Sequence, residues 1–193
     1  MMNQTDERKE VIVFEDRKLG KLVAEEICGT ADLSVLTPEN MKQVTEIFDI
    51  TILEERKEED KITSLKGLEY CVNLKQLHLV KHKIDDLQPI AQLSKLEVLN
   101  LRGNQVKELN AVGKLTTLRT LVVGQNNIEH LPSLEQLTSL ERFYIQENPI
   151  ESGSLGFLHE LGDLEEVCCW ETNQTIILES KFLPDHIRVS NEK

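Results

Sequence analysis

The residues whose types and spacing most suggest chemistry in this sequence are two histidines, His78 and His82, four positions apart. On a helix, that spacing would place two metal-ligating imidazoles on one face. The repeat pattern described below instead assigns them to a strand and the turn that follows it, so the ligand geometry fails. The sequence therefore predicts no metal site and no cofactor.

No other group of residues has the spacing of a catalytic site. Asp85–Asp86 and Glu165–Glu166 are adjacent carboxylates on repeat surfaces and not an acid–base pair in a cleft. No CxxC pair occurs, and unpaired cysteines fit a reducing compartment. The chain has four cysteines, at Cys28, Cys71, Cys168 and Cys169. We therefore expect a protein that is not an enzyme.

The elements that would position these side chains are set by an internal repeat. Lines that begin at Leu74, Leu96 and Leu118 are each 22 residues long, and the line from Leu140 has 24. Apolar residues recur at positions 1, 4, 6, 11, 14, 17 and 20 of each full line. This is the leucine-rich repeat pattern, which predicts a short strand, a turn and a return segment in every coil.

Stacking such coils pairs their strands in parallel around one continuous core. The predicted fold is therefore α/β, a right-handed leucine-rich repeat solenoid with a parallel concave sheet and an N-terminal helical cap. Asparagine occupies position 9 in three lines, as Asn104, Asn126 and Asn148. Because a buried amide can both donate and accept, we expect these side chains to bridge neighbouring coils. His82 and Thr172 take this position in the outer lines, where we expect the ladder to end.

Three parts are predicted along the chain: an N-terminal extension and helical cap at 1–43, about six coils at 44–173, and a C-terminal cap at 174–193. In the first part, Asp16 and Gly29 delimit one helix, and Thr37 and Pro38 begin a second. A charged insertion near 53–61 interrupts the first coil, whose strand lies within 44–52. We interpret this insertion as a solvated loop that aids solubility.

These features together resemble the internalin-type leucine-rich repeat proteins of bacteria. The resemblance rests on an opening F-x-D-x-x-L, a short helical cap, the segment ITSLKGLEYCVNLKQLHL and the lines of 22 residues, and it covers roughly residues 12–170. It implies a curved solenoid that binds a protein on its concave sheet. The repeat length is also similar to that of the leucine-rich regulators of protein phosphatase 1.

The register predicts which residues face a partner. Positions 2, 3, 5, 7 and 8 of each line point outward, and cations dominate the first lines whereas glutamates dominate the last. Two aromatic residues, Tyr144 and Trp170, are expected anchors, because Tyr and Trp often supply most of the energy of an interface. Folding of Trp170 beneath the C-terminal cap is the alternative. The predicted contact residues are Tyr144, Arg102, Trp170, Arg119, Lys81, His78, Gln146 and Val122.

Charge narrows the class of partner. The net charge is −12, and no run of Lys or Arg occurs, so we expect neither nucleic acid nor an anionic membrane as a partner. The first residues lack the basic start and apolar stretch of a signal peptide, which favours a cytoplasmic location. The sequence thus predicts a monomeric interaction module for one protein. A secreted or surface adhesion protein and a regulatory subunit of a phosphatase-like enzyme stay open as alternatives.

Overall fold

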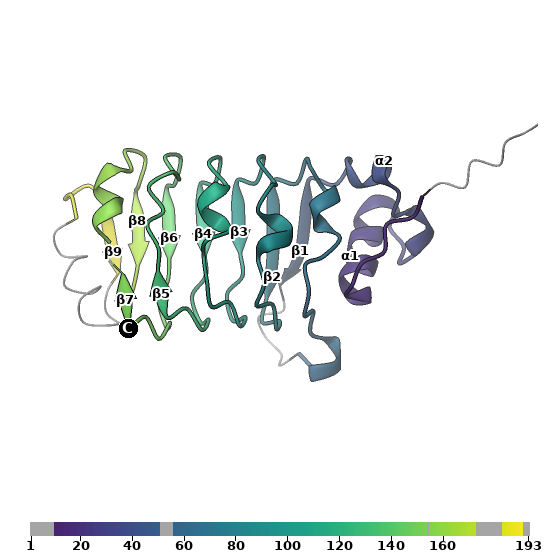
Figure 1. Ribbon diagram of the computed structural model, residues 1–193, viewed down its shortest axis with the longest axis horizontal. Coiled ribbons are helices and arrows are strands. Elements are labelled where there is room, and N and C mark those ends of the chain that lie inside the picture. Colours follow the sequence, from purple (N-terminus) through teal and green to yellow (C-terminus); the bar gives the residue numbers. More distant parts are fainter. Residues whose placement is uncertain (1–9, 51–55, 154, 173–182, 191–193) are drawn as a thin grey trace, which may run out of the picture.

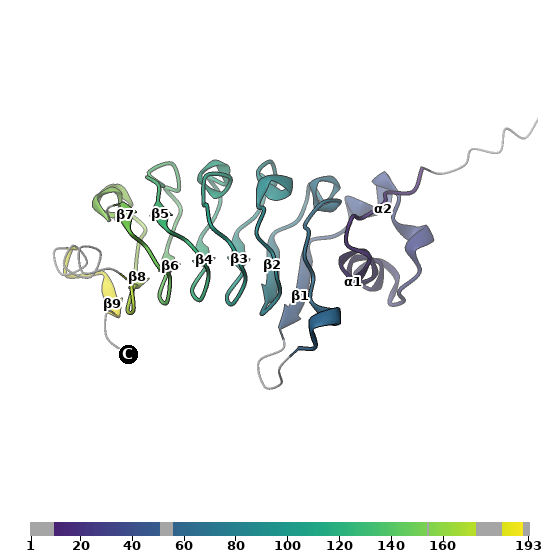
Figure 2. The ribbon, with the colours of Figure 1, turned by 60° about the horizontal axis from the view of Figure 1, so that its bottom comes forward.

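The computed structural model describes residues 10–50, 56–153, 155–172 and 183–190, and the fold is the predicted solenoid. Its coils lie side by side along the long axis, with the helical cap at one end (Figures 1 and 2). One parallel sheet runs the length of the solenoid in the order β1-β2-β3-β4-β6-β8-β9. Its strands are β1 (Glu46–Ile50), β2 (Gln76–Val80), β3 (Val98–Asn100), β4 (Thr120–Val122), β6 (Arg142–Tyr144), β8 (Glu166–Cys168) and β9 (Arg188–Ser190).

The return segments of the coils form the opposite layer. They contain short 3-10 helices at Leu68–Tyr70, Gln88–Ile90, Val112–Lys114 and Gly156–Glu160, and a small parallel pair of strands, β5 (His130–Leu131) and β7 (Ser152–Gly153). The repeated apolar positions of both layers point into one core. Position 4 shows the register best, because Leu77, Leu99, Leu121, Phe143 and Val167 are neighbours in successive strands and are all buried.

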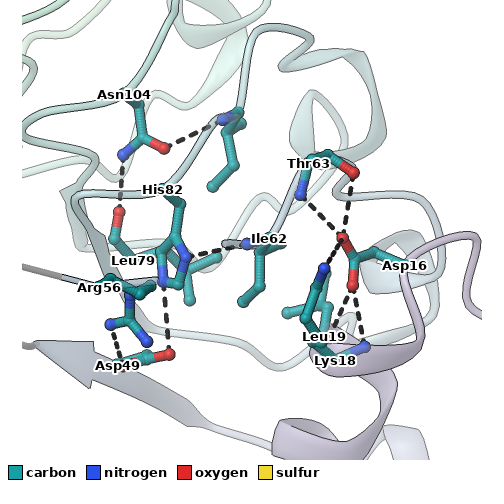
Figure 3. Close-up of polar contacts among 11 residues, drawn as sticks. Asp16, Lys18, Leu19, Asp49, Arg56, Ile62, Thr63, Leu79, His82 and Asn104 are labelled. Carbon is teal, nitrogen blue, oxygen red and sulfur yellow. Dashed lines mark hydrogen bonds and ion pairs between the residues drawn. The ribbon is translucent and has the colours of Figure 1, made fainter. Parts of the chain in front are cut away.

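The described part of the N-terminal cap contains α1 (Arg17–Cys28), a 3-10 turn (Leu33–Val35) and α2 (Pro38–Met41). Asp16 caps α1 by accepting from the backbone amides of Lys18 and Leu19, and Gly29 ends the helix in the left-handed conformation, at φ 72°. The second oxygen of Asp16 accepts from the amide and the hydroxyl of Thr63, at 2.8 and 3.1 Å (Figure 3). One carboxylate thus starts the cap helix and ties it to the first coil.

The position-9 side chains bridge neighbouring coils. Oδ1 of Asn104 accepts from the amide of Ile84 one coil earlier, at 3.1 Å, and Nδ2 donates to the carbonyl of Leu79 (Figure 3). Nδ2 also donates to the carbonyl of Leu101. Asn126 and Asn148 repeat this arrangement. In the two outer lines, the residue at position 9 makes one of these two kinds of bond. His82 Nδ1 accepts from the amide of Ile62, and Thr172 Oγ1 donates to the carbonyl of Cys169.

The residue before each of these side chains has a left-handed backbone. Position 8 holds Lys81, Gly103, Gln125, Glu147 and Glu171, with φ between 52° and 71°. Only one of the five is glycine, so four coils accept a conformation that costs a non-glycine residue about 1 kcal/mol or more. The turn into the return segment needs this backbone, and the asparagine bonds that follow it hold the turn in place.

The expected C-terminal cap at 174–193 is described at residues 183–190. The rest of it, at 174–182 and 191–193, lies outside the described residues. Leu183 and Ile187 are buried against the last coil, as an apolar cap requires. β9 was not predicted: it adds a further parallel strand to β8 through pairs such as Val167 with Val189. The boundaries at 43 and 173 stay predictions.

Candidate functional site

The side of the main sheet that faces away from the core, called the open face below, corresponds to the predicted concave face. It contains a hollow of about 650 Å³. The hollow is bounded by side chains from positions 5, 7 and 8 of successive coils, because these positions alternate with the buried positions 4 and 6. Its lining residues are Ile50, Val80, Lys81, Asn100, Arg102, Val122, Gln125, Tyr144, Gln146, Cys168 and Trp170.

The structure brings six of the eight predicted contact residues together in this hollow. They are Tyr144, Arg102, Trp170, Lys81, Gln146 and Val122. Tyr144 and Trp170 are both half-buried. The other two residues do not line it. Arg119 lies at the edge of the open face and pairs with Glu141, and His78 stacks on Phe48 with 4.5 Å between ring centroids. Contact of any of the eight residues with a partner stays a prediction.

The expectation that Gln146 faces solvent is wrong. Its side chain lies flat on the backbone of Gly124, where an added Cβ would lie 2.7 Å from the Gln146 Cδ atom, and the residue is only 5% exposed. The missing side chain at position 124 is the reason, since it leaves a space that the next coil's glutamine fills. Among the described residues, no hydrogen-bond donor reaches Gln146 Oε1. A buried amide with an unsatisfied acceptor therefore forms part of the hollow.

The predicted gradient of charge is offset by pairing between coils. Lys75 lies 3.4 Å from Glu97, and Arg119 pairs with Glu141. Near the C-terminal end, Arg188 of β9 lies 3.2 Å from Glu166. Cations and carboxylates at equal positions of neighbouring coils are about one strand spacing apart, which is close enough for such pairs. Much of the charge on the open face is thus compensated within the face.

Residues of β1 extend the apolar surface beyond the predicted set. Phe48 and Ile50 are exposed, at 44% and 42%, and occupy positions 5 and 7 of the first coil. The predicted contact positions began with the line at Leu74 and so omitted them, although the apolar residues of VTEIFDITI were a usable signal. Val80 and Cys168, predicted to face outward, are buried by their neighbours in the hollow.

Burial also decides the ionisation of the side chains here. It lowers the pKa of His78 below its ordinary value, with Glu46 opposing the shift. Burial raises the pKa of the Cys168 thiol, as it raises that of Cys71 to about 12, so neither is a ready nucleophile. In the part of the chain that the structure describes, no three His, Cys, Asp or Glu side chains are grouped to hold a metal.

Acidification is expected to destabilise the chain in part through His78. Because the pKa of His78 is lowered in the folded state, the unfolded chain binds the proton more readily, and stability falls as pH drops through the ordinary histidine value. Urea unfolding at pH 7.5 and 5.5 measures this loss. The His78→Gln variant should lose less stability over that range than the wild type. Equal losses would show that His78 does not contribute.

The charged insertion was interpreted as a solvated loop, and this is wrong for Arg56. Its side chain is 13% exposed and lies 2.6 Å from Asp49 Oδ1, while His82 Nε2 lies 3.3 Å from Asp49 Oδ2 (Figure 3). Asp49 occupies position 6, an apolar position in the full lines. Burial raises its pKa, but the bonds from His82 and Arg56 outweigh this and lower it. Residues 53–55 of the insertion lie outside the described residues.

Comparisons with known proteins agree with this architecture. A family model described as leucine-rich repeat region matches residues 33–175. The chain belongs to the leucine-rich repeat family. Among curated protein sequences, none matches the chain.

Solved structures show the same fold at low sequence identity. An internalin C2 from Listeria monocytogenes has a TM-score of 0.71 and 20% identity, over 94% of this chain and 77% of that one. An internalin InlF from the same species has a TM-score of 0.60 and 20% identity, over 86% of this chain but 54% of that one. A leucine-rich repeat protein from Leptospira interrogans has a TM-score of 0.56 and 23% identity, over 68% of this chain and 34% of that one. The internalin-type fold inferred from the sequence is confirmed, and this chain spans about half the length of InlF.

No helix within the described ranges is long and apolar enough to cross a membrane.

Families with this fold are typically protein-interaction modules rather than enzymes.

Proposed function

We propose that this chain is a non-catalytic interaction module that binds a protein partner on its open face, in the cytoplasm. The hollow carries the proposal, because it combines two half-buried aromatic residues with aliphatic side chains on a rigid sheet. Tyr and Trp in such a setting are the usual energetic anchors of protein interfaces. The ion pairs around the hollow can form the polar rim of an interface. Exposed pairs of this kind contribute little energy, so a partner that covers them loses little.

Photo-crosslinking tests where a partner lies. Benzoylphenylalanine is placed at Val122, which lines the hollow, and separately at Asn110, which is exposed on a return segment. Crosslinked proteins are then identified by mass spectrometry after irradiation in a lysate of the source cell. A protein crosslinked from position 122 and not from position 110 supports binding on the open face. A partner crosslinked only from position 110 would contradict it.

Truncation of Tyr144 is expected to weaken binding of the crosslinked partner. The Tyr144→Ala variant should lose about 2 kcal/mol of binding free energy, or roughly thirtyfold in affinity, because an anchor residue is removed from the hollow. Isothermal titration calorimetry measures the change. Tyr70 provides the matched control, since it is the other tyrosine of the chain and is 44% exposed on a return segment. Equal losses for Tyr70→Ala and Tyr144→Ala would count against the open face.

A further inference from the structure

The hollow is long enough to hold a peptide segment rather than a single side chain. It extends from Ile50 at the end of β1 to Trp170, which follows β8. Five strand intervals separate these ends in the sheet order. At about 4.8 Å per interval, the length is about 24 Å, which matches about seven residues of extended chain.

Chemical character changes along this length. Ile50 and Val80 provide an apolar region at one end, and Val122, Tyr144 and Trp170 provide a larger one at the other. The two ionisable cations of the lining are Arg102, on the third coil between these regions, and Lys81, next to Val80 on the second coil. No carboxylate is found among its described lining residues, although the chain as a whole carries a net charge of −12. The centre of the hollow is therefore a local exception to an acidic protein.

Arg102 keeps capacity for a further anionic contact. Its Nε donates to Gln125 Oε1 at 3.0 Å, and its Nη2 lies 3.7 Å from Glu147 Oε1. A guanidinium has five N–H donors, and these two contacts use a minority of them. Its side chain is 44% exposed. Glu147 also accepts from Gln125 Nε2 at 2.8 Å, so its charge is shared between two neighbours.

A second observation points to a ligand at the same place. Gln146 lines the hollow and is buried, yet its Oε1 has no donor in the described structure. Leaving a buried acceptor unsatisfied is unfavourable, and a donor on a bound segment would relieve part of this cost. The backbone N–H groups of an extended peptide are donors of that kind.

We propose that the hollow binds an extended segment of a partner protein that carries an acidic residue between two apolar residues. The carboxylate contacts Arg102 and Lys81, the apolar side chains occupy the two ends, and a backbone N–H of the segment donates to Gln146. This assignment rests on the proposed function and specifies the chemistry of the partner.

A peptide selection tests the proposal even while the partner protein is unidentified. Random dodecapeptides displayed on phage are selected on the full chain, and enriched peptides are synthesised with their acidic residue intact or changed to the matching amide. Binding is read from the fluorescence of Trp170, the single tryptophan of the chain, with peptides that lack tryptophan. The protein variants are Arg102→Glu, Arg17→Glu and Tyr144→Ala, each checked by melting temperature. Arg17→Glu makes the same change of charge at an exposed residue of α1, away from the open face.

The expected result is enrichment of peptides with Asp or Glu between apolar residues. Arg102→Glu should weaken their binding at least about tenfold, Arg17→Glu less than about twofold, and the amide peptide should bind Arg102→Glu and wild type alike. Enriched peptides that depend on Tyr144 but need no carboxylate would overturn this inference and leave the proposed function standing. Binding unchanged by both Tyr144→Ala and Arg102→Glu would overturn the inference and also count against the open face.

Discussion

Replacing Asn126 by leucine is expected to lower the free energy of unfolding by about 3 kcal/mol. Oδ1 of Asn126 accepts from the amide of Val106 at 2.9 Å, and Nδ2 donates to the carbonyls of Leu101, Val123 and Gly124. Each carbonyl has another donor: Leu101 accepts from Asn104, Val123 from Asn148 and Gly124 from the amide of Gly103. The variant therefore leaves one buried donor, the Val106 amide, without a partner.

Urea unfolding of the wild type and Asn126→Leu measures this difference, with the dependence on denaturant fitted for each protein. Asn127→Leu is the matched control, because Asn127 is the next residue and is exposed. It should change stability by less than about 0.5 kcal/mol. A similar small change for Asn126→Leu would show that the amide ladder does not contribute to stability as described.

Substitution of Asp49 is the other change with a large expected effect. The Asp49→Leu variant restores the apolar residue typical of position 6, but it removes the partner of Arg56 and of the fully buried His82 side chain. Breaking a buried ion pair on one side costs about 3 to 5 kcal/mol, and the 24% exposure of the Asp49 side chain reduces this to about 2 to 3 kcal/mol here. Urea unfolding measures the loss.

A second substitution should recover part of that loss. In Asp49→Leu/His82→Asn, an asparagine at position 82 can accept from the Ile62 amide as Asn104 does from the Ile84 amide, so both positions match the other coils. The free energy of unfolding of the double variant is expected to exceed that of Asp49→Leu by at least about 1 kcal/mol. Simple additivity of the two single variants would show that Asp49 and His82 are not coupled.

The Asp49 contribution should also depend on pH. Its pKa is lowered in the folded state, so its stabilising effect is present above the ordinary aspartate value and is lost as pH falls through the folded value. The difference in stability between wild type and Asp49→Leu should therefore shrink in acid. A difference that stays constant down to pH 2 would contradict the assigned ion pairs.

The candidate site was predictable in part. Tyr144, Trp170, Val122, Arg102 and Lys81 could be placed on the open face because strand alternation and the repeat length assign each residue a direction. The rule also placed Gln146 on the open face, but it did not predict that its side chain is buried. Its burial depends on Gly124 one coil earlier, and so on a contact between residues from two different coils.

The amino-acid sequence by itself determined the path of each coil, the continuous core, the bridging asparagines and the start of the N-terminal cap. These follow from local periodicity, since a residue's position in its line sets whether it enters the core or faces outward. Only the tertiary structure decided that Arg56 joins Asp49 and His82, that cations and carboxylates pair across the open face, and that a hollow lined by two cations remains. The physical reason is that these features depend on side-chain conformations and distances between coils, which a repeating pattern of residue types does not specify.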